Sequence, residues 1–173
     1  MHTAVTGLTG CGKSTLVMKL FRGFRRQGFP TMVLTAVEED LPRWQQVADF
    51  VTMDEEAFDR VFWSPASRGF MAAIDEGSEF VGRYDKVFTK CFTRGRRRAS
   101  LFAIAQRTTD LNRSARSQCQ QVIAFGQDAG DAKALISDTG KRELIQVADL
   151  ERYEYLVARR FEKEVRRGRV TPL

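Results

Sequence analysis

The sequence predicts an α/β fold in which helices cover both faces of a mainly parallel sheet. Short apolar runs alternate along the 173 residues with segments whose apolar positions recur every three or four residues. These are the patterns of buried strands and of amphipathic helices. A glycine-rich motif joins the first run to the first helix. Because no repeat or low-complexity linker interrupts the pattern, we expect one domain over residues 1–173, with a short basic C-terminal extension over about 159–173.

Apolar spacing predicts the elements of the first half. Residues 2–6 form an apolar run that leads into the glycine-rich motif, and residues 13–27 place apolar side chains along one side of a helix that a glycine and a proline end. The run 31–37 is rich in β-branched residues, as expected of a buried strand. Helical spacing then occurs twice, which predicts helices over residues 41–50 and 54–63.

The second half continues the alternation after a Ser-Pro break. Continuous apolar runs predict strands over residues 69–76, 100–106, 121–125 and 155–158. Helical spacing predicts helices over residues 78–93, 111–117 and 129–137. Residues 142–147 favour no single structure, and the charged segment 164–170 fits either the arm of a hairpin or a frayed end.

The glycine-rich motif is the most specific feature of the chain. Residues 7–15 fit G-x-x-x-x-G-K-[ST], the loop that wraps the phosphates of a nucleoside triphosphate, and they stand between a strand and a helix as that loop requires. Lys13 would reach the β- and γ-phosphates, and the Ser14 hydroxyl would take one position on Mg²⁺. We therefore expect ATP and Mg²⁺ here, with contacts from Gly7, Leu8, Thr9, Gly10, Cys11, Gly12, Lys13, Ser14 and Thr15.

Polar residues follow two further buried strands. Asp75 and Glu76 end the strand 69–76, and Gln106 ends the strand 100–106. In a parallel sheet these ends meet at the edge that carries the phosphate loop. Asp75 would hold Mg²⁺, Glu76 would activate the attacking water, and Gln106 would sense the γ-phosphate. A catalytic glutamate directly after the magnesium aspartate points to hydrolysis of ATP.

Arginines lie at the opposite edge. Arg94, Arg96, Arg97 and Arg98 precede their strand, whereas the phosphate loop follows its strand. These arginines are too far from the nucleotide of their own subunit, so one of them could act only on a neighbour's nucleotide in a head-to-tail ring. A solvated basic loop is the alternative. Arg113 and Arg116 are rival candidates, as arginine fingers or as residues that face a pore.

Composition limits the other classes of function. The net charge of +6 and the pI of about 9.5 permit a nucleic-acid partner without requiring one. No apolar run is long enough to span a bilayer, and one histidine and three scattered cysteines leave little material for metal chemistry. We therefore expect a cytoplasmic protein. Cys11, inside the phosphate loop, is either a thiol of lowered pKa or a small residue that fits the turn.

The sequence around Gln106 resembles a known family. Residues 105–111, 114–119 and 122–125 resemble the glutamine motif and following strand of the FtsK–HerA superfamily, hexameric DNA-pumping ATPases that include viral and phage genome-packaging ATPases. Gly95-Arg96 resembles the family's Gly-Arg, whose arginine enters the adjacent subunit's site. The resemblance runs from about Ala4 to Ile136, although the spacing from Gly-Arg to glutamine is one residue short.

The resemblance implies a three-layer P-loop NTPase fold of the RecA-like (ASCE) type and an ATP-hydrolysing double-stranded DNA translocase that packages a viral genome. The implied catalytic residues are Glu76, Lys13, Gln106 and Arg96, with Ser14 and Asp75 at the metal. The implied partners are duplex DNA of any sequence, a homo-oligomeric ring of six copies, and a capsid or viral-membrane docking protein. The corresponding location is the host cytoplasm or the packaging vertex of a virion.

Two other functions remain open at this point. A small nucleotide or metabolite kinase has a similar size and the same phosphate loop. An assembly or export ATPase of the filamentous-phage type shares the superfamily. Ring formation and stimulation by duplex DNA would favour the translocase over both.

Overall fold

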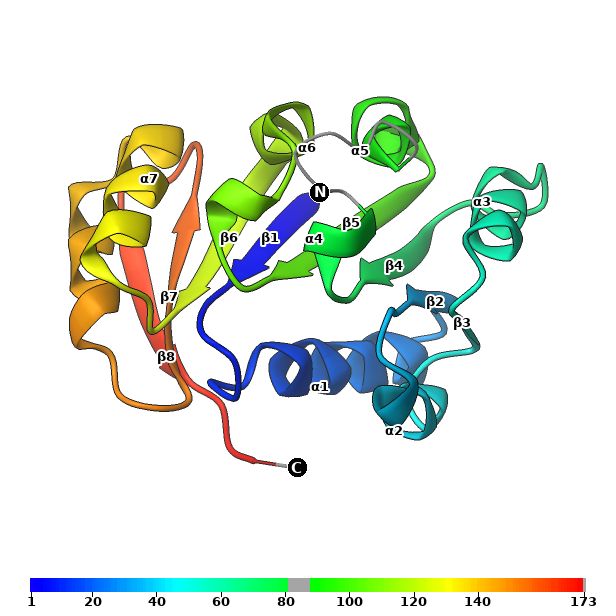
Figure 1. Ribbon diagram of the computed structural model, residues 1–173. Helices are drawn as coiled ribbons and strands as arrows, with labels where there is room; N and C mark the ends of the chain where they lie inside the picture. The colour runs from blue at the N-terminus through cyan, green and yellow to red at the C-terminus, as the bar shows by residue number, and fades with distance from the viewer. Residues whose placement is uncertain (81–87, 173) are drawn as a thin grey trace.

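The computed structural model describes residues 1–80 and 88–172. Within these residues eight strands form one sheet in the order β3-β2-β4-β5-β1-β6-β7-β8 (Figure 1). The strands are β1 (His2–Thr6), β2 (Thr31–Leu34), β3 (Phe50–Thr52), β4 (Phe70–Ile74), β5 (Ala99–Ala105), β6 (Cys119–Phe125), β7 (Glu154–Arg159) and β8 (Val165–Arg169). The strands β1 to β6 pair in parallel, and β7 and β8 are antiparallel. The predicted α/β fold with a mainly parallel sheet is confirmed.

Helices connect the strands and lie on both faces of the sheet. The α-helices are α1 (Lys13–Arg26), α2 (Leu41–Gln45), α3 (Glu55–Trp63), α4 (Gly77–Phe80), α5 (Thr89–Arg94), α6 (Arg113–Gln118) and α7 (Ala129–Thr139). Short 3₁₀ helices are η1 (Glu38–Asp40), η2 (Gly95–Arg97), η3 (Thr108–Asp110) and η4 (Arg142–Asp149). The helix predicted over 78–93 falls partly outside the described residues, and its two ends are α4 and α5.

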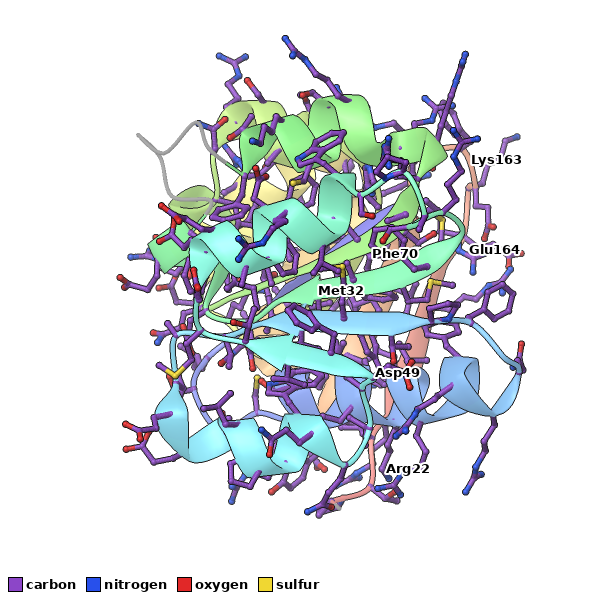
Figure 2. All side chains as sticks on the ribbon, turned by 90° about the vertical axis from the view of Figure 1, so that its right-hand side faces the viewer. Arg22, Met32, Asp49, Phe70, Lys163 and Glu164 are labelled. Atoms are coloured by element: carbon purple, nitrogen blue, oxygen red, sulfur yellow. The ribbon has the colours of Figure 1, made fainter. Side chains whose placement is uncertain are left out.

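Two apolar cores lie on either side of the sheet. Along β5, Leu101 and Ala103 enter one core, while Phe102 and Ile104 enter the other, as the two-residue period of a strand requires. One core packs against α1 and α2, and the other against α3 to α7 (Figure 1). Figure 2 views the β3 edge of the sheet, where Met32 of β2 and Phe70 of β4 lie on the side of α3.

The helix predicted over residues 41–50 is wrong in its second half. α2 ends at Gln45, and a strand absent from the prediction, β3, begins at Phe50. The carboxylate of Asp49 accepts hydrogen bonds from the Thr31 backbone N–H at 2.9 Å and from the Thr31 hydroxyl at 2.8 Å. This contact ties the start of β3 to the start of β2, a long-range pairing that local helical spacing does not reveal.

The C-terminal segment joins the sheet. Residues 142–147, which favoured no structure in the sequence, belong to the 3₁₀ helix η4. Of the two alternatives for residues 164–170, the hairpin arm is correct, since β8 pairs with β7 from Glu154↔Arg169 to Ala158↔Val165. No helix among the described residues has both the length and the apolar character to cross a membrane.

Candidate nucleotide-binding site

The two strands that flank β1 hold the start of the phosphate loop. The Gly7 N–H donates to the Gln106 carbonyl at the end of β5, and the Leu8 N–H donates to the Gly126 carbonyl just after β6, both at 3.0 Å. Gly7, Gly10 and Gly12 all have positive φ angles, which residues that carry a side chain rarely adopt. These contacts fix the loop at the carboxyl edge of the parallel strands, where α/β sheets bind ligands.

The N-terminus of α1 is available to an anion. Gly12 precedes the helix in the left-handed conformation, and among the described residues no side chain caps this end. The first turn contains no acidic residue. The Lys13 ammonium lies 2.8 Å from the Gly7 carbonyl oxygen and 3.0 Å from that of Leu8, so it is held inside the loop. A helix N-terminus and a lysine that converge on one loop make a candidate phosphate site.

Asp75 connects the end of β4 to the phosphate loop. It follows β4, is 2% exposed, and its Oδ1 accepts a hydrogen bond from the Ser14 hydroxyl at 3.2 Å. Its Oδ2 accepts a hydrogen bond from the Trp44 indole N–H at 2.8 Å. Burial raises the pKa of Asp75 to about 6, with a smaller lowering by the Trp44 bond and a raising by the charge of Asp40. No local pattern in the sequence assigns Trp44 to this site, because only the fold brings α2 to the end of β4.

The adjacent glutamate has an unusual backbone. Glu76 has a φ of +52°, one of two non-glycine residues in the described chain with a positive φ. Its backbone N–H donates to Asp75 Oδ1 at 3.2 Å, so its main chain lies one hydrogen bond from the carboxylate that contacts Ser14. Backbone strain of this kind is concentrated at functional sites. The hydrogen bond and the positive φ together place a strained residue directly beside the Ser14–Asp75 contact.

Gln106 follows the strand that lies between β4 and β1. It follows β5, its side chain is exposed, and its carbonyl accepts the Gly7 N–H. The ends of β4 and β5 are neighbours in the sheet, with Ile74 opposite Ala103. The fold thus brings Lys13, Ser14, Asp75, Glu76 and Gln106 to one edge of the sheet, although they are spread over more than half of the chain.

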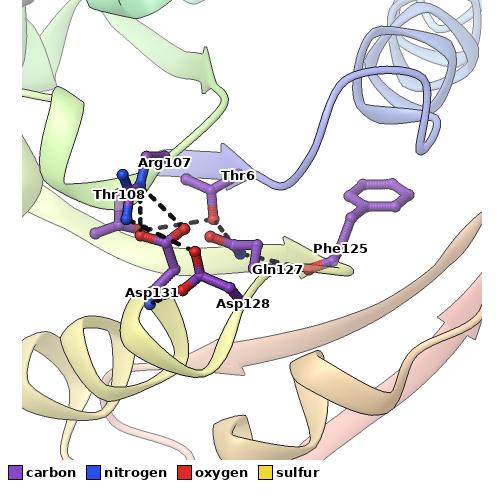
Figure 3. A network of polar contacts seen from close by, with 7 residues as sticks. All are labelled: Thr6, Arg107, Thr108, Phe125, Gln127, Asp128 and Asp131. Atoms are coloured by element: carbon purple, nitrogen blue, oxygen red, sulfur yellow. Dashed lines mark hydrogen bonds and ion pairs between the residues drawn. The ribbon is translucent and has the colours of Figure 1, made fainter.

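A network of polar side chains supports the loop from β6 and α7 (Figure 3). Gln127 Nε2 donates to the Thr6 hydroxyl at 3.0 Å, and the Thr108 hydroxyl donates to the same oxygen at 3.4 Å. The Arg107 guanidinium binds both carboxylate oxygens of Asp131, at 2.8 and 3.1 Å. The network ties Thr6, which precedes Gly7, to Gln127, and it ties Arg107, which follows Gln106, to Asp131 of α7. No motif in the sequence includes Gln127, although it lies two residues after the strand 122–125 that the resemblance covers.

Residues that flank the C-terminal strands pack against the phosphate loop. A Cβ at Gly12 would lie 2.9 Å from Tyr153 Cδ1 and 2.9 Å from Val170 Cγ1. The guanidinium of Arg152 lies over the Tyr153 ring, and its Nε donates to the Gly10 carbonyl at 3.1 Å. Tyr153 is the second residue with a positive φ, +71°. The turn before β7 and the residue after β8 therefore hold the outer surface of the phosphate loop.

Arg96 lies at the opposite edge. It is exposed and precedes β5, while Gln106 follows β5. The seven residues of β5 separate them, and a strand rises about 3.3 Å per residue. Its charge instead lowers the pKa of two groups at the start of β1, the Met1 amine and His2, although burial is the larger cause for both. The structure therefore places Arg96 out of reach of its own subunit's phosphate loop.

Two of the rival arginines have local partners. Arg98 donates to the carbonyl oxygens of Ser64 at 3.0 Å and Ser67 at 3.3 Å, and it lies over the ring of Trp63. Arg116 forms an ion pair with Asp138. The exposed candidates that remain beside Arg96 are Arg94, Arg97 and Arg113.

The cysteines are buried and unpaired. Burial raises the pKa of Cys11, and it raises the pKa of Cys91 and of Cys119 to about 12. For Cys11, the alternative of a small residue that fits the turn is the one that agrees with its environment. A Cβ at Gly7 would lie 3.0 Å from the Cys11 sulfur, so the thiol fills the inside of the turn.

The oxygen atoms at this edge fit magnesium. Among residues 1–80 and 88–172, no group of three or more His, Cys, Asp or Glu side chains could hold a metal alone. The Ser14 hydroxyl and the Asp75 carboxylate offer one hydroxyl and one carboxylate oxygen. Mg²⁺ is bound in nucleotide sites by this small number of protein oxygens, together with phosphates and water.

Comparison with known proteins agrees with this architecture. No protein-family model and no curated protein sequence matches the chain. Among solved structures, the chain is similar to the genome packaging NTPase B204 from Sulfolobus turreted icosahedral virus 2 in complex with AMPPCP, with a TM-score of 0.79 at 13% identity over 99% of this chain and 97% of that chain. The fold is therefore shared over nearly the whole of both chains.

Two larger proteins contain the same fold. The pCW3 conjugation coupling protein TcpA matches with a TM-score of 0.73 at 13% identity, over 97% of this chain and 59% of that chain. The Type VII secretion ATPase EccC of Thermomonospora curvata matches with a TM-score of 0.72 at 14% identity, over 99% of this chain and 25% of that chain. The P-loop NTPase fold that the sequence indicated is thus confirmed.

Proposed function

We propose that this protein is an ATP-hydrolysing double-stranded DNA translocase that packages a viral genome. The observation that carries the proposal is the similarity to a genome packaging NTPase over 99% of this chain and 97% of that one. The site geometry supports it independently, because the phosphate loop, Asp75, Glu76 and Gln106 meet at one edge of the sheet.

Each residue at this edge has a role in the proposed hydrolysis. Lys13 and the N–H groups at the start of α1 bind the phosphates of ATP, and Ser14 and Asp75 hold Mg²⁺, which neutralises phosphate charge. The Glu76 carboxylate accepts a proton from the attacking water. The Gln106 amide contacts the γ-phosphate or that water, and reports which nucleotide is bound.

The proposed assembly is a ring of six copies that encloses DNA. Arg96 lies at the edge opposite to the phosphate loop, so a head-to-tail ring would bring it to the neighbour's nucleotide. An arginine supplied in trans stabilises the charge of the transferred phosphoryl group. Basic loops that face the pore would contact the phosphate backbone and read no sequence. A capsid or viral-membrane protein would dock the ring at the packaging vertex.

ATP turnover with and without duplex DNA tests this function. We expect hydrolysis to require Mg²⁺, to be stimulated by duplex DNA of any sequence, and to lose that stimulation as salt rises, since salt competes for the phosphate backbone. Glu76→Gln should lower turnover by at least about 100-fold while ATP binding persists, because the proton acceptor is lost.

Glu79→Gln is the matched control. Glu79 is exposed in α4, three residues beyond Glu76, so its substitution should leave turnover unchanged. Full turnover in Glu76→Gln would show that another residue activates the water. Mass measurement with AMPPCP, Mg²⁺ and DNA completes the test: a ring supports the translocase, and a monomer that phosphorylates a small acceptor would identify a kinase.

An assembly or export ATPase is the second candidate. The similarity to the Type VII secretion ATPase EccC, with a TM-score of 0.72, favours it. Such a protein would hydrolyse ATP with the same residues, but duplex DNA would not stimulate it. The response of turnover to DNA therefore separates the two candidates.

A further inference from the structure

Trp44 forms a buried hydrogen bond to the carboxylate at the centre of the candidate site. The residue lies in α2, is 0% exposed, and donates its indole N–H to Asp75 Oδ2 at 2.8 Å. The other carboxylate oxygen, Oδ1, accepts the Ser14 hydroxyl and the Glu76 backbone N–H, each at 3.2 Å. The two oxygens of Asp75 thus have separate partners.

Trp44 links three elements that are separate in the sequence. The Trp44 ring meets the Phe21 ring of α1 edge to face, with centroids 5.9 Å apart. α1 carries Lys13 and Ser14 at its start, and Asp75 follows β4. Trp44 is therefore packed between the helix that begins at the phosphate loop and the strand that ends at the acid.

We propose that Trp44 is a positioning residue for Asp75: its indole N–H fixes the carboxylate so that Oδ1 faces Ser14. A carboxylate with a single anchored oxygen can rotate about its Cβ–Cγ bond, whereas one with both oxygens bonded has a fixed plane. Residues that orient a metal-binding carboxylate in this way govern metal affinity. The inference rests on the proposed function, because it assumes that Asp75 and Ser14 hold Mg²⁺.

The substitution Trp44→Phe tests the role of the N–H. Phenylalanine keeps an aromatic ring against Phe21 and removes only the donor and part of the ring volume. We expect the Mg²⁺ concentration that half-saturates ATP turnover to rise about 10-fold. Turnover at saturating Mg²⁺ should change much less, since Lys13 and Glu76 are untouched. Thermal shift gives a readout without turnover: Mg²⁺ with AMPPCP should stabilise the variant only at correspondingly higher Mg²⁺.

The chain provides a matched control in its second tryptophan. The Trp63 indole N–H donates to Asp59 Oδ1 at 2.9 Å, so Trp63→Phe removes the same type of bond far from the phosphate loop. This control should keep the wild-type Mg²⁺ requirement. Because the protein has two tryptophans, Trp63→Phe also leaves Trp44 as the single indole fluorophore.

Tryptophan fluorescence supplies a second, independent measurement. With Trp63→Phe, titration of Mg²⁺ in the presence of AMPPCP should change the Trp44 emission, whereas Trp44→Phe, which retains only Trp63, should show no change. If Trp44→Phe does not fold, the titration of Trp63→Phe decides alone, and an unchanged emission overturns the proposal.

The outcomes separate this inference from the proposed function. If the wild-type protein shows no Mg²⁺-dependent binding of AMPPCP, the proposed function fails. If the wild type binds and Trp44→Phe keeps the same Mg²⁺ requirement, the positioning role alone is wrong. A tenfold shift confined to Trp44→Phe supports the positioning role, which mere filling of the core would not produce.

Discussion

At the scale of single residues, buried polar groups set how the protein responds to pH. His2 is 1% exposed in β1, its Nδ1 accepts the Leu101 N–H at 3.2 Å, and its ring meets Phe92 edge to face. Burial, with smaller contributions from the Met1 amine and Arg96, lowers the pKa of His2 from 6.5 to about 4. The folded protein therefore holds this imidazole neutral at pH values where the unfolded chain protonates it.

This shift predicts a loss of stability in acid. Between pH 6.5 and about 4 the unfolded state binds a proton at His2 that the folded state does not, so the contribution of His2 to the free energy of unfolding falls as pH falls through that window, while the raised pKa of Asp75 acts in the opposite direction below pH 6. At pH 5 the loss from His2 is about 2 kcal/mol. His2→Asn keeps an acceptor for Leu101 and does not titrate. Urea unfolding at pH 7 and pH 5 should show a smaller loss in the variant, and equal losses in both proteins would contradict the assignment.

At the scale of elements, two glycines have different roles in α1: Gly12 precedes the helix and Gly23 lies within it. Gly12, at its N-terminus, has a φ of +107° and no room for a Cβ beside Tyr153 and Val170. Gly23 lies in the interior of α1, and a Cβ there would meet no atom within 4 Å. The first glycine is required by the loop, and the second only weakens the helix.

Alanine at the two positions should therefore have opposite effects. Gly12→Ala forces a side chain into a strained backbone and a close contact, so we expect lower stability and loss of AMPPCP binding. Gly23→Ala should raise the free energy of unfolding by about 0.5–1 kcal/mol and leave binding intact, because alanine favours the helix. Thermal unfolding and calorimetry measure both. Unimpaired binding in Gly12→Ala would mean that the loop rearranges to accept a side chain.

At the scale of the whole molecule, the parallel strands separate two functional edges. The phosphate loop, Asp75 and Gln106 lie at the carboxyl edge, and Arg96 lies at the amino edge beside Met1 and His2. Because Arg96 cannot reach the phosphate loop of its own copy, the proposed site is complete only between two copies.

Mixing two inactive variants tests this arrangement. Lys13→Ala removes the phosphate-binding lysine, and Arg96→Ala removes the proposed finger, so each alone should lose most DNA-stimulated turnover. An equal mixture should recover about a quarter of the wild-type activity, since that share of contacts between copies pairs an intact Lys13 with an intact Arg96. Arg94→Ala changes a rival candidate two residues away, and it should remain active if Arg96 is the arginine that acts in trans. No recovery from rings that have assembled would show that Arg96 does not act between copies.

Much of this fold was predictable because its signals are local. Apolar runs and helical spacing located the strand before the phosphate loop, helix α1, and the strands that end at Asp75 and Gln106. The C-terminal hairpin remained one of two alternatives, since a charged segment such as 164–170 pairs only when a partner strand is present. β3 was missed because three residues of half-buried strand have no period long enough to detect, and its pairing depends on Asp49 and Thr31.

The sequence by itself determined the phosphate loop, the positions of the main strands along the chain and the edge at which their polar ends meet, because these follow from motif, spacing and the geometry of parallel pairing. Only the tertiary structure decided which side chains support that edge. Trp44 bonds to Asp75, Gln127 bonds to Thr6, and Tyr153 and Val170 lie against Gly12. Such contacts depend on how layers pack across the sheet, which no local pattern of residues records.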